Sequence, residues 1–501
     1  MTNEDSFDVA IIGAGITGLV AANYLAKDGL RVLLLEQHTA LGGCCSYFSR
    51  RGFTFDCGAH SLGSFRPGGQ FTRVFKDLGL TNSFSINKAP ISDTVIMKNF
   101  EANFSGEKFQ FVEELSKHFP SERKALDAFF SEVDRFESSH AMTFARYHTK
   151  YENSSFQDVL NHFFEDESLK KILCVFLGNI GLPSHLVAAL PAITMFKEFV
   201  FDGGYYFIGG MKKLSDILSV NFKKMGGVVS INKKVTKICL KNRTVIGVEI
   251  TGDKFISAKY VISTASTRQT FTQLLDTKDL PGSLLKKVSS FKPSVSCVIA
   301  FLGLKGAPIH TQNWGRTVWY VPNWNADEIY TKLYNNGLDE NAEALVMTFP
   351  SHFDPSLAPS GCSTMNVLIG ASFQTADFWK RRKQFFFESM LSRIGSLLPE
   401  LKDRIIVSEV GSPSTMRRYT LNDEGAMYGL SATIAQSRYD LMPSQTYFDG
   451  LYLAGQWTTL SAGQSGTPAA AYAGQRVAKI ILKDFSKKKS ATFNYELGKG
   501  A

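Results

Sequence analysis

The chain has 501 residues, about three times the usual length of one domain, so two domains or one large discontinuous domain are expected. Hydrophobic residues make up 44% and charged residues 20%, which is close to globular averages and excludes a disordered or fibrous protein. The net charge of +9 is compatible with nucleic acid, an anionic membrane or simple solubility. The 40 phenylalanines favour a large apolar interior or an apolar ligand site over a nucleic-acid groove.

Targeting signals and the spacing of cysteines indicate the cellular compartment that we expect for the protein. No apolar run reaches the roughly 18–20 residues of a membrane-spanning helix, so we expect none. The first residues are acidic and lack the cleavage pattern of a secretory signal. The seven cysteines lack the spacing of a disulfide or zinc framework, which predicts a reducing, cytoplasmic compartment and no bound metal.

The first forty residues have the pattern of a strand–turn–helix–strand unit. Residues 7–12 are a short apolar run typical of a buried parallel strand. Residues 19–26 have the spacing of a packed helix, and residues 31–35 form a second apolar run that ends at Glu36. The turn between the first strand and the helix reads GAGITG over residues 13–18.

Each residue type in this unit has a physical reason. Gly13 allows a tight turn, Gly15 lets the backbone approach a pyrophosphate, and Gly18 allows close packing of helix on strand. The helix N-terminus offers N–H groups and a positive dipole end to phosphates. Glu36 lies within reach of an adenosine ribose hydroxyl, and its carboxylate disfavours a 2′-phosphate. The unit therefore predicts dinucleotide binding, and both NAD and FAD fit it.

A second glycine pair, Gly42-Gly43, follows the acidic strand end and precedes Cys44. This arrangement resembles the extended fingerprint of FAD-binding amine-oxidase-like and carotenoid-desaturase-like flavoproteins. In that group an arginine that pairs with the pyrophosphate often follows the glycine pair. Cys44 stands there in this chain, so backbone amides at the glycine pair take that role. The cysteine also favours the isomerase and saturase branches over a bacterial-type phytoene desaturase.

Later segments resemble the same superfamily of phytoene desaturases, carotenoid isomerases and retinol saturases. Residues 53–60, FTFDCGAH, resemble an aromatic-Asp-x-Gly segment near the flavin ring, and residues 207–211, FIGGM, resemble the start of a helix. The position of Val235 matches a residue whose backbone contacts adenine. The strand and loop at 450–457 and 463–468, with the helix that follows, resemble the segment that covers the ribityl chain and faces the flavin.

The resemblance implies a set of cofactor-binding positions in this chain. They are Gly13, Gly15, Ile16, Thr17, Gly18, Glu36, Gln37, Gly42, Gly43, Cys44, Gly58, Ala59, His60, Val235, Gly455, Gln456, Gly466 and Thr467.

The motif positions predict an α/β fold. We expect a Rossmann-like, glutathione-reductase-like FAD-binding domain with an inserted α+β substrate domain that contains a mixed sheet. The FAD-binding pieces are residues 1–95, 200–285 and 410–485; the substrate domain is 96–199 and 286–409; a basic tail is 486–501. We find no second glycine unit for an NADPH domain, so an external electron donor or acceptor is expected.

Apolar patterns in the middle of the chain predict helices over 110–140 and a sheet strand over 294–304. Residues 170–200 are strongly apolar and are interrupted by prolines. Most of these apolar side chains are expected in the core, and the remainder would line a substrate tunnel. The lysines at 487–489 predict solvated chain or weak attraction to anionic lipid.

Together these features predict an FAD-dependent desaturase, saturase or redox-neutral isomerase acting on C–C double bonds of a long apolar, isoprenoid or polyene substrate. His60 is either a catalytic group or a structural histidine, and Trp457 either lines the site or packs in the core. A flavin amine oxidase acting on a smaller amine is one alternative. A non-catalytic FAD-binding partner of a membrane pathway is another. Peripheral membrane contact is compatible with each of these functions, and no nucleic-acid partner is expected.

Overall fold

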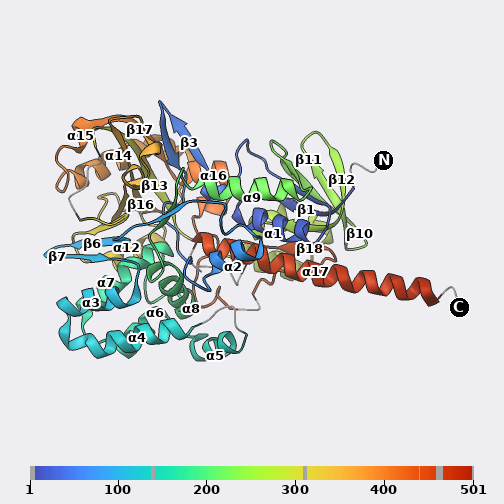
Figure 1. The fold of residues 1–501 in the computed structure, drawn as a ribbon, viewed down its shortest axis with the longest axis horizontal. Coiled ribbons are helices and arrows are strands. Elements are labelled where there is room, and N and C mark those ends of the chain that lie inside the picture. Colours follow the sequence, from blue (N-terminus) through green and yellow to red (C-terminus); the bar gives the residue numbers. More distant parts are fainter. Residues whose placement is uncertain (1–5, 137–140, 308–312, 439–440, 459–465, 499–501) are drawn as a thin grey trace.

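The computed structural model describes residues 6–136, 141–307, 313–438, 441–458 and 466–498, and it is a mixed α/β structure built on two seven-stranded sheets (Figure 1). Two small antiparallel pairs, β3 with β4 and β5 with β8, lie outside these sheets. The bounds of these four strands are β3 Tyr47–Arg50, β4 Phe53–Asp56, β5 Ile86–Lys88 and β8 Tyr205–Phe207.

The first sheet has the strand order β10-β11-β12-β1-β2-β9, with β18 also paired to β12. Its centre is parallel, because β1 pairs in parallel with both β2 and β12, while β10, β11 and β12 form an antiparallel meander. The strands come from three separate stretches of the chain. Their bounds are β1 Ser6–Ile12, β2 Val32–Leu35, β9 Val228–Ser230, β10 Val235–Lys241, β11 Thr244–Ile250, β12 Lys254–Ser263 and β18 Leu451–Leu453.

Three helices from distant parts of the chain pack together beside this sheet: α1 (Ile16–Lys27), α9 (Lys212–Lys224) and α17 (Gly466–Gly498) (Figure 1). The Asn23 side-chain amide of α1 donates to the Leu218 carbonyl of α9 at 2.9 Å. A Cβ on Gly474 of α17 would lie 2.4 Å from the Thr17 carbonyl, so only glycine allows the two helices to approach so closely. The far end of the chain is thus fixed beside the N-terminal strand.

The second sheet has the order β17-β13-β16-β15-β14-β6-β7, with β14 and β6 parallel and the other pairs antiparallel. Alternate side chains enter different cores: Val95 faces a core shared with α3, α4 and α6–α8, and Ile96 faces a core shared with α14. The strand bounds are β6 Asp93–Met97, β7 Phe100–Phe104, β13 Ser296–Lys305, β14 Thr317–Val321, β15 Leu345–Thr348, β16 Cys362–Ala371 and β17 Ile405–Gly411.

Helices cover both faces of the second sheet (Figure 1). Those of the lower layer are α3 Lys108–His118, α4 Arg123–Arg135, α5 Ala141–Tyr151, α6 Phe156–Phe163, α7 Glu167–Val175 and α8 Ala189–Met195. The remaining helices are α2 Gln70–Asp77, α10 Thr267–Thr272, α11 Gly282–Ser289, α12 Ala326–Tyr334, α13 Pro350–Phe353, α14 Ala376–Ile394, α15 Leu401–Arg404 and α16 Pro413–Thr420. Many of the phenylalanines lie in the core between this helical layer and the second sheet, as the composition predicts.

A buried ion pair fixes the loop after β4 to the lower helices. Arg66 donates to Glu198 at 2.7 Å and to Asp202 at 3.2 Å, and both carboxylate side chains are almost fully buried. The Ser64 hydroxyl also donates to Glu198. Two buried carboxylates that share one guanidinium hold this loop, which leads from the predicted flavin segment into α2.

Local predictions for the N-terminal unit, the helices over 110–136 and the strand over 294–304 are confirmed; residues 137–140 lie outside the described residues. The lysines at 487–489 are exposed, as predicted, but they lie in a helix and not in irregular chain. Helix α17 continues through the lysine run to Gly498, and residues 475–497 contain no glycine or proline that would interrupt it. Among the described helices, none is both long and apolar enough to cross a bilayer.

Candidate functional site

The glycine turn between β1 and α1 has three different constraints. Gly13 has φ of +95°, and a Cβ there would lie 2.4 Å from the Thr264 hydroxyl oxygen. A Cβ on Gly18 would lie 2.1 Å from the Gly13 carbonyl oxygen. By contrast, a Cβ on Gly15 would meet nothing within 4 Å. The backbone at Gly15 therefore borders open space at the start of a helix, where a diphosphate can approach.

Glu36 lies at the end of β2, across from this turn. Its carboxylate accepts hydrogen bonds from the Ala14 N–H at 2.9 Å and from the His38 N–H at 3.0 Å, and the residue is 8% exposed. The Lys233 N–H donates to the Glu36 carbonyl at 2.8 Å, which brings the segment before Val235 to the same strand end. Gln37 is half-buried beside His38. The predicted ribose and adenine positions therefore lie together.

The second glycine pair lies against the first turn. The Gly42 N–H donates to the Ala14 carbonyl at 2.8 Å, and Gly42 has φ of +108°. A Cβ on Gly43 would lie 3.2 Å from the Gly15 Cα. A larger side chain at Gly43 would therefore fill the space that Gly15 leaves open, so the two loops form one cradle.

Cys44 continues this cradle towards the segment predicted near the flavin ring. Its side chain is exposed, and burial among the neighbouring protein atoms raises the pKa of its thiol. The Cys44 carbonyl accepts from the Ala59 N–H at 2.9 Å, and a Cβ on Gly58 would lie 3.0 Å from that carbonyl oxygen. All seven cysteines of the chain are free.

The C-terminal segment reaches the same place. The Thr17 hydroxyl donates to the Ala470 carbonyl at 3.0 Å, and a Cβ on Gly455 would lie 3.4 Å from that hydroxyl oxygen. The Cys45 sulfur lies 3.6 Å from the Thr467 hydroxyl, at the start of α17. Ile16 and Gly466 begin the two helices concerned, α1 and α17. Residues 463–465 of the predicted loop lie outside the described residues.

His60 lies beyond Ala59 and is partly exposed. Its Nδ1 lies 3.3 Å from the Gly58 carbonyl, and its Nε2 has no hydrogen-bond partner among the residues that the structure describes. Burial lowers the pKa of His60, and the nearby Arg316 guanidinium lowers it further. The neutral imidazole is therefore favoured, with one ring nitrogen available to a ligand.

Asp56 belongs to the 53–60 motif and connects it to the 207–211 motif. Its carboxylate accepts from the Met211 N–H at 2.9 Å and from the Tyr206 hydroxyl. Burial raises its pKa to about 6. The sequence shows Asp56 within the motif, but its link to residues 150 positions away depends on tertiary contact. The link fixes the start of α9 relative to the flavin segment.

Arg316, from the residue before β14, is a functional candidate that the sequence analysis missed. It is 1% exposed, its Nε donates to the Gly204 carbonyl at 3.1 Å, and its guanidinium lies 3.8 Å from the Phe353 ring centre and 4.9 Å from the Tyr206 ring centre. Its two terminal nitrogens have no hydrogen-bond partner among the described residues. Burial lowers its pKa to about 9. A lone arginine beside an apolar strand gave no sequence signal.

Two aromatic residues near the predicted flavin position have different environments. Trp457 is 2% exposed within the core of the first sheet, and its indole N–H donates to the Asn422 side chain at 3.2 Å. A catalytic role for Trp457 stays a prediction. Tyr428 is partly exposed and donates to the Gly178 carbonyl at 2.9 Å. Burial raises the pKa of Tyr428, and the Cys297 and Cys44 thiols raise it further.

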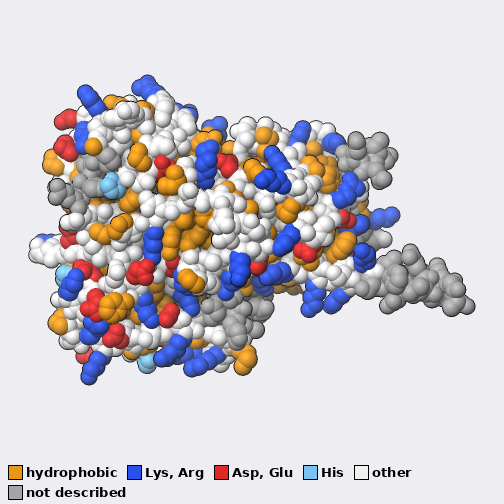
Figure 2. All heavy atoms as spheres, in the orientation of Figure 1, with side chains coloured by type: hydrophobic (Ala, Val, Ile, Leu, Met, Phe, Trp, Pro, Cys, Tyr) orange, Lys and Arg blue, Asp and Glu red, His pale blue; other side chains and the backbone are white. Residues whose placement is uncertain are grey.

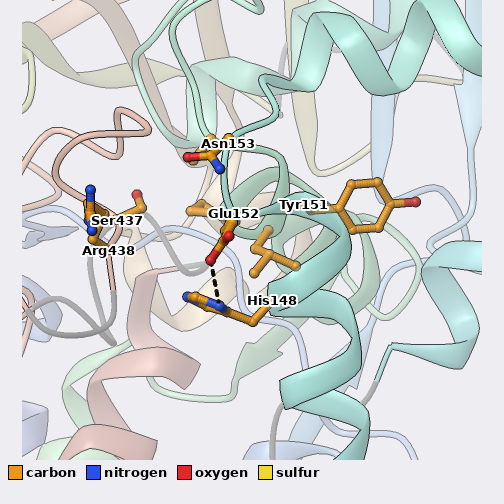
Figure 3. Close-up of a pocket in the computed structure, with 9 residues that line it drawn as sticks. His148, Tyr151, Glu152, Asn153, Ser437 and Arg438 are labelled. Carbon is orange, nitrogen blue, oxygen red and sulfur yellow. Dashed lines mark ion pairs between the residues drawn. The ribbon is translucent and has the colours of Figure 1, made fainter.

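A cavity of about 430 Å³ lies between α5, the start of α8 and the segment that contains Ser437 and Arg438 (Figure 3). Its polar wall includes the His148–Glu152 ion pair, with an Nδ1 to Oε2 distance of 3.4 Å. Ser437 and Arg438 lie opposite that pair, while the Tyr151 ring points away towards Glu132. Leu190 and Pro191 supply its apolar lining.

The converging glycine segments, the oriented glutamate and the open space between them define a nucleotide-cofactor site in an α/β protein. A family comparison then identifies the cofactor. The chain belongs to the flavin containing amine oxidoreductase family, whose model matches residues 16–482. The protein is therefore an enzyme, a flavin-dependent oxidoreductase, and FAD is its cofactor.

Relatives align along nearly the whole chain. Prolycopene isomerase 2 from an Oncidium hybrid cultivar is 26% identical, over 97% of this chain and 86% of its own length. All-trans-retinol 13,14-reductase from Rattus norvegicus is 28% identical, over 90% of this chain and 82% of its own. The name of the first relative refers to a carotenoid and that of the second to a retinoid, in agreement with the superfamily that the motifs resemble.

Solved structures share the fold. An oxidoreductase from Methanosarcina mazei has a TM-score of 0.66 at 20% identity and covers 94% of this chain and 99% of its own. Cyclohexylamine oxidase from Brevibacterium oxydans has a TM-score of 0.64 at 15% identity and covers 96% of this chain and 100% of its own. At these identities the likeness shows the fold alone.

We expect Gly15→Ala to weaken FAD binding and Gly18→Ala to destabilise the fold. A methyl group at residue 15 meets no protein atom, so apoprotein stability should stay within about 1 kcal/mol while FAD affinity falls at least about tenfold. A methyl group at residue 18 meets the Gly13 carbonyl at 2.1 Å, so stability should fall by about 2 kcal/mol or more. Chemical unfolding of apoprotein and flavin absorbance titration measure both. Equal FAD affinity of wild type and Gly15→Ala would contradict the assignment.

Proposed function

We propose that the protein acts on C–C double bonds of a long apolar isoprenoid or polyene, as a saturase, desaturase or redox-neutral isomerase. The observation that supports this most is the alignment of prolycopene isomerase and all-trans-retinol 13,14-reductase across at least 90% of this chain. Prolycopene and retinol are both conjugated isoprenoids. Similarity that extends over both sheets includes the half that would contact substrate as well as the cofactor half.

We propose that the first sheet and its helices form a Rossmann-like FAD-binding domain, and that the second sheet belongs to the substrate domain. The predicted boundary after residue 95 cuts strand β6, which begins at Asp93, and the boundary after residue 409 cuts β17, which ends at Gly411. We therefore place the domain junctions just before Asp93 and just after Gly411. Hydrogen-bonded strands of one sheet belong to one folding unit.

The cofactor would lie along the cradle, with its diphosphate at Gly15 and Gly43, its ribose at Glu36 and its ring near Gly58 and His60. Bound FAD supplies hydride acceptance or donation. The chain holds and orients the substrate and excludes water, because unactivated C–C bonds need little acid–base assistance. Neutral His60, with a free Nε2, would hold a polar end of the substrate or a proton near the reacting carbons.

The cavity between α5 and α8 would be the outer end of the substrate route. The Leu430 N–H donates to the Gln456 carbonyl at 3.2 Å, at the predicted cofactor segment. The Ala188 N–H, at the cavity, donates to the Ala432 carbonyl at 2.9 Å. Leu430 and Ala432 are two residues apart, so at most about 7 Å of chain separates these contacts. A long apolar molecule can span such a separation.

Amine oxidation is the second candidate, favoured by the description of the family to which the chain belongs. It differs from the leading proposal in its products, because amine oxidation with oxygen releases peroxide. Since the chain belongs to an oxidoreductase family, a purely non-catalytic role has no support.

Anaerobic titration of oxidised and photoreduced holoenzyme with all-trans-retinol, a poly-cis carotene and an amine panel tests the proposal. We expect absorbance changes at about 370 and 450 nm that accompany desaturation or saturation. Altered double-bond geometry at constant flavin colour would instead identify isomerisation. Reduction of the flavin by amines alone, with no polyene converted, would overturn the proposal in favour of amine oxidation.

His60→Gln tests the role of the imidazole. Because burial lowers the pKa of His60, the neutral form prevails at and above the ordinary histidine value of 6.5 and is lost only at more acidic pH. We expect wild-type kcat/KM to be level around neutrality and to fall on the acid side. The variant should lose about tenfold or more in kcat and also lose the acid limb. An unchanged pH profile at full flavin content would assign His60 a structural role.

Leu190→Trp tests the substrate route. The larger side chain would fill part of the cavity, so KM for a long carotenoid should rise at least about tenfold, with little change in flavin spectrum or in kcat. Leu190→Met, which nearly conserves volume, is the matched control. Unchanged KM in the tryptophan variant would exclude the cavity from the route.

A further inference from the structure

A groove of about 450 Å³ runs between α2 and α17, outside the cofactor cradle. Arg73 lies on its α2 side, and Arg476, Lys479 and Lys483 lie on its α17 side. Tyr472 and Ile480 of α17, both partly exposed, form an apolar floor. The groove therefore combines several cations with an apolar base.

The basic residues of α17 follow helical spacing. Arg476, Lys479, Lys483 and Lys487 are separated by three, four and four residues, so they lie within about 80° of one another around the helix. Tyr472 and Ile480 fall on this same side. We call these four residues the α17 basic face.

The charges of this face are not neutralised within the described part of the protein. None of its four residues forms an ion pair with a described carboxylate, and its three lysines are exposed. The neighbouring Lys488 differs, because it pairs with Asp449 at 3.0 Å and with Asp484 at 3.1 Å.

Asp77 is the acidic residue among those that line the groove, and its carboxylate forms hydrogen bonds within the protein. The Asp77 carboxylate accepts from the Tyr24 hydroxyl at 2.8 Å and from the Gln475 amide at 2.9 Å. Lys27 donates to the backbone carbonyl of the same residue. Asp77 therefore serves the packing of α1, α2 and α17, and the groove keeps an excess of positive charge.

The position of α17 leaves this face accessible. The helix passes α2 and its last turns extend beyond the first sheet (Figure 1). Figure 2 shows lysine and arginine side chains along the described part of this region. The exposed lysines of α17 are therefore open to contact with an anionic surface.

We propose that the α17 basic face and the groove beside it dock the enzyme on a bilayer that contains anionic phospholipid. The lysines would contact the headgroup layer, and Tyr472 with Ile480 would meet the region below it. This proposal rests on the proposed function, because a long apolar substrate is held in membranes and docking shortens its path to the enzyme. The attraction corresponds to about fivefold in affinity for each lysine near the surface.

Co-sedimentation of holoenzyme with vesicles tests the docking surface. We expect binding to vesicles of phosphatidylcholine with phosphatidylglycerol, little binding to phosphatidylcholine alone, and weakening as salt rises. K479E/K483E/K487E should lose at least about 50-fold in affinity. The matched control K380E/K383E/K402E makes the same change in net charge with exposed lysines on and near α14, and it should bind nearly as wild type.

Equal binding by the α17 variant and wild type, or equal loss in both triple variants, would overturn the proposal. Binding of a duplex oligonucleotide with none to anionic vesicles would also overturn it. Flavin absorbance and turnover of detergent-dispersed polyene separate this result from the proposed function. The α17 variant should keep both, whereas absence of polyene turnover in wild type that still binds vesicles would refute the function alone.

Discussion

The structure depends on the close approach of three backbone segments around α1. Gly18 brings the first turn of α1 against the Gly13 carbonyl, and Gly474 brings α17 against the Thr17 carbonyl. Neither position has room for a Cβ. Because both contacts fall within the first turn of α1, they fix that helix end between β1 and the C-terminal helix. The same turn stays open at Gly15, where the proposed cofactor site lies.

This arrangement explains why cofactor-binding segments come from distant parts of the chain. The Thr17 hydroxyl binds the Ala470 carbonyl, and Asp56 binds the start of α9 through the Met211 N–H. Each interaction joins a segment of the N-terminal unit to a helix formed much later in the sequence. The site is therefore complete only when the whole chain has folded, and its geometry reports tertiary structure more than local structure.

Arg316 connects the second sheet to the small β5–β8 pair. It lies directly before β14 of the second sheet, but its guanidinium contacts the Gly204 carbonyl and the Tyr206 ring beside Asp56. Burying a cation with two unpaired nitrogens is unfavourable for folding, and stacking on Phe353 offsets only part of that penalty. The present arrangement leaves Arg316 close enough to favour neutral His60.

Helices, strands and turns that depend on short-range patterns were predicted from the sequence. The periodicity of residues 7–35, the glycine positions and the apolar run at 294–304 identified their elements, because burial of one face imposes a repeat. Arg316 and the partners of Asp56 could not be found, since their contacts join residues more than a hundred positions apart. The helical tail was missed because the prediction followed apolar repeats, whereas lysine, alanine and leucine extend a helix by propensity alone.

The cysteine at position 44 changes how the charge of a bound diphosphate is balanced. Where an arginine follows the glycine pair, a full positive charge stands beside the phosphates. At the proposed site of this chain, the balance would depend on backbone N–H groups of the two glycine loops and on the dipole of α1, whose N-terminal end provides about half a positive charge. Partial charges of this kind act over one helical turn, so the phosphates must lie close to the backbone. The open space at Gly15 and the contact of Gly43 with the Gly15 Cα permit that approach. In the proposed site, the backbone geometry of these two loops would therefore take the place of the side-chain cation.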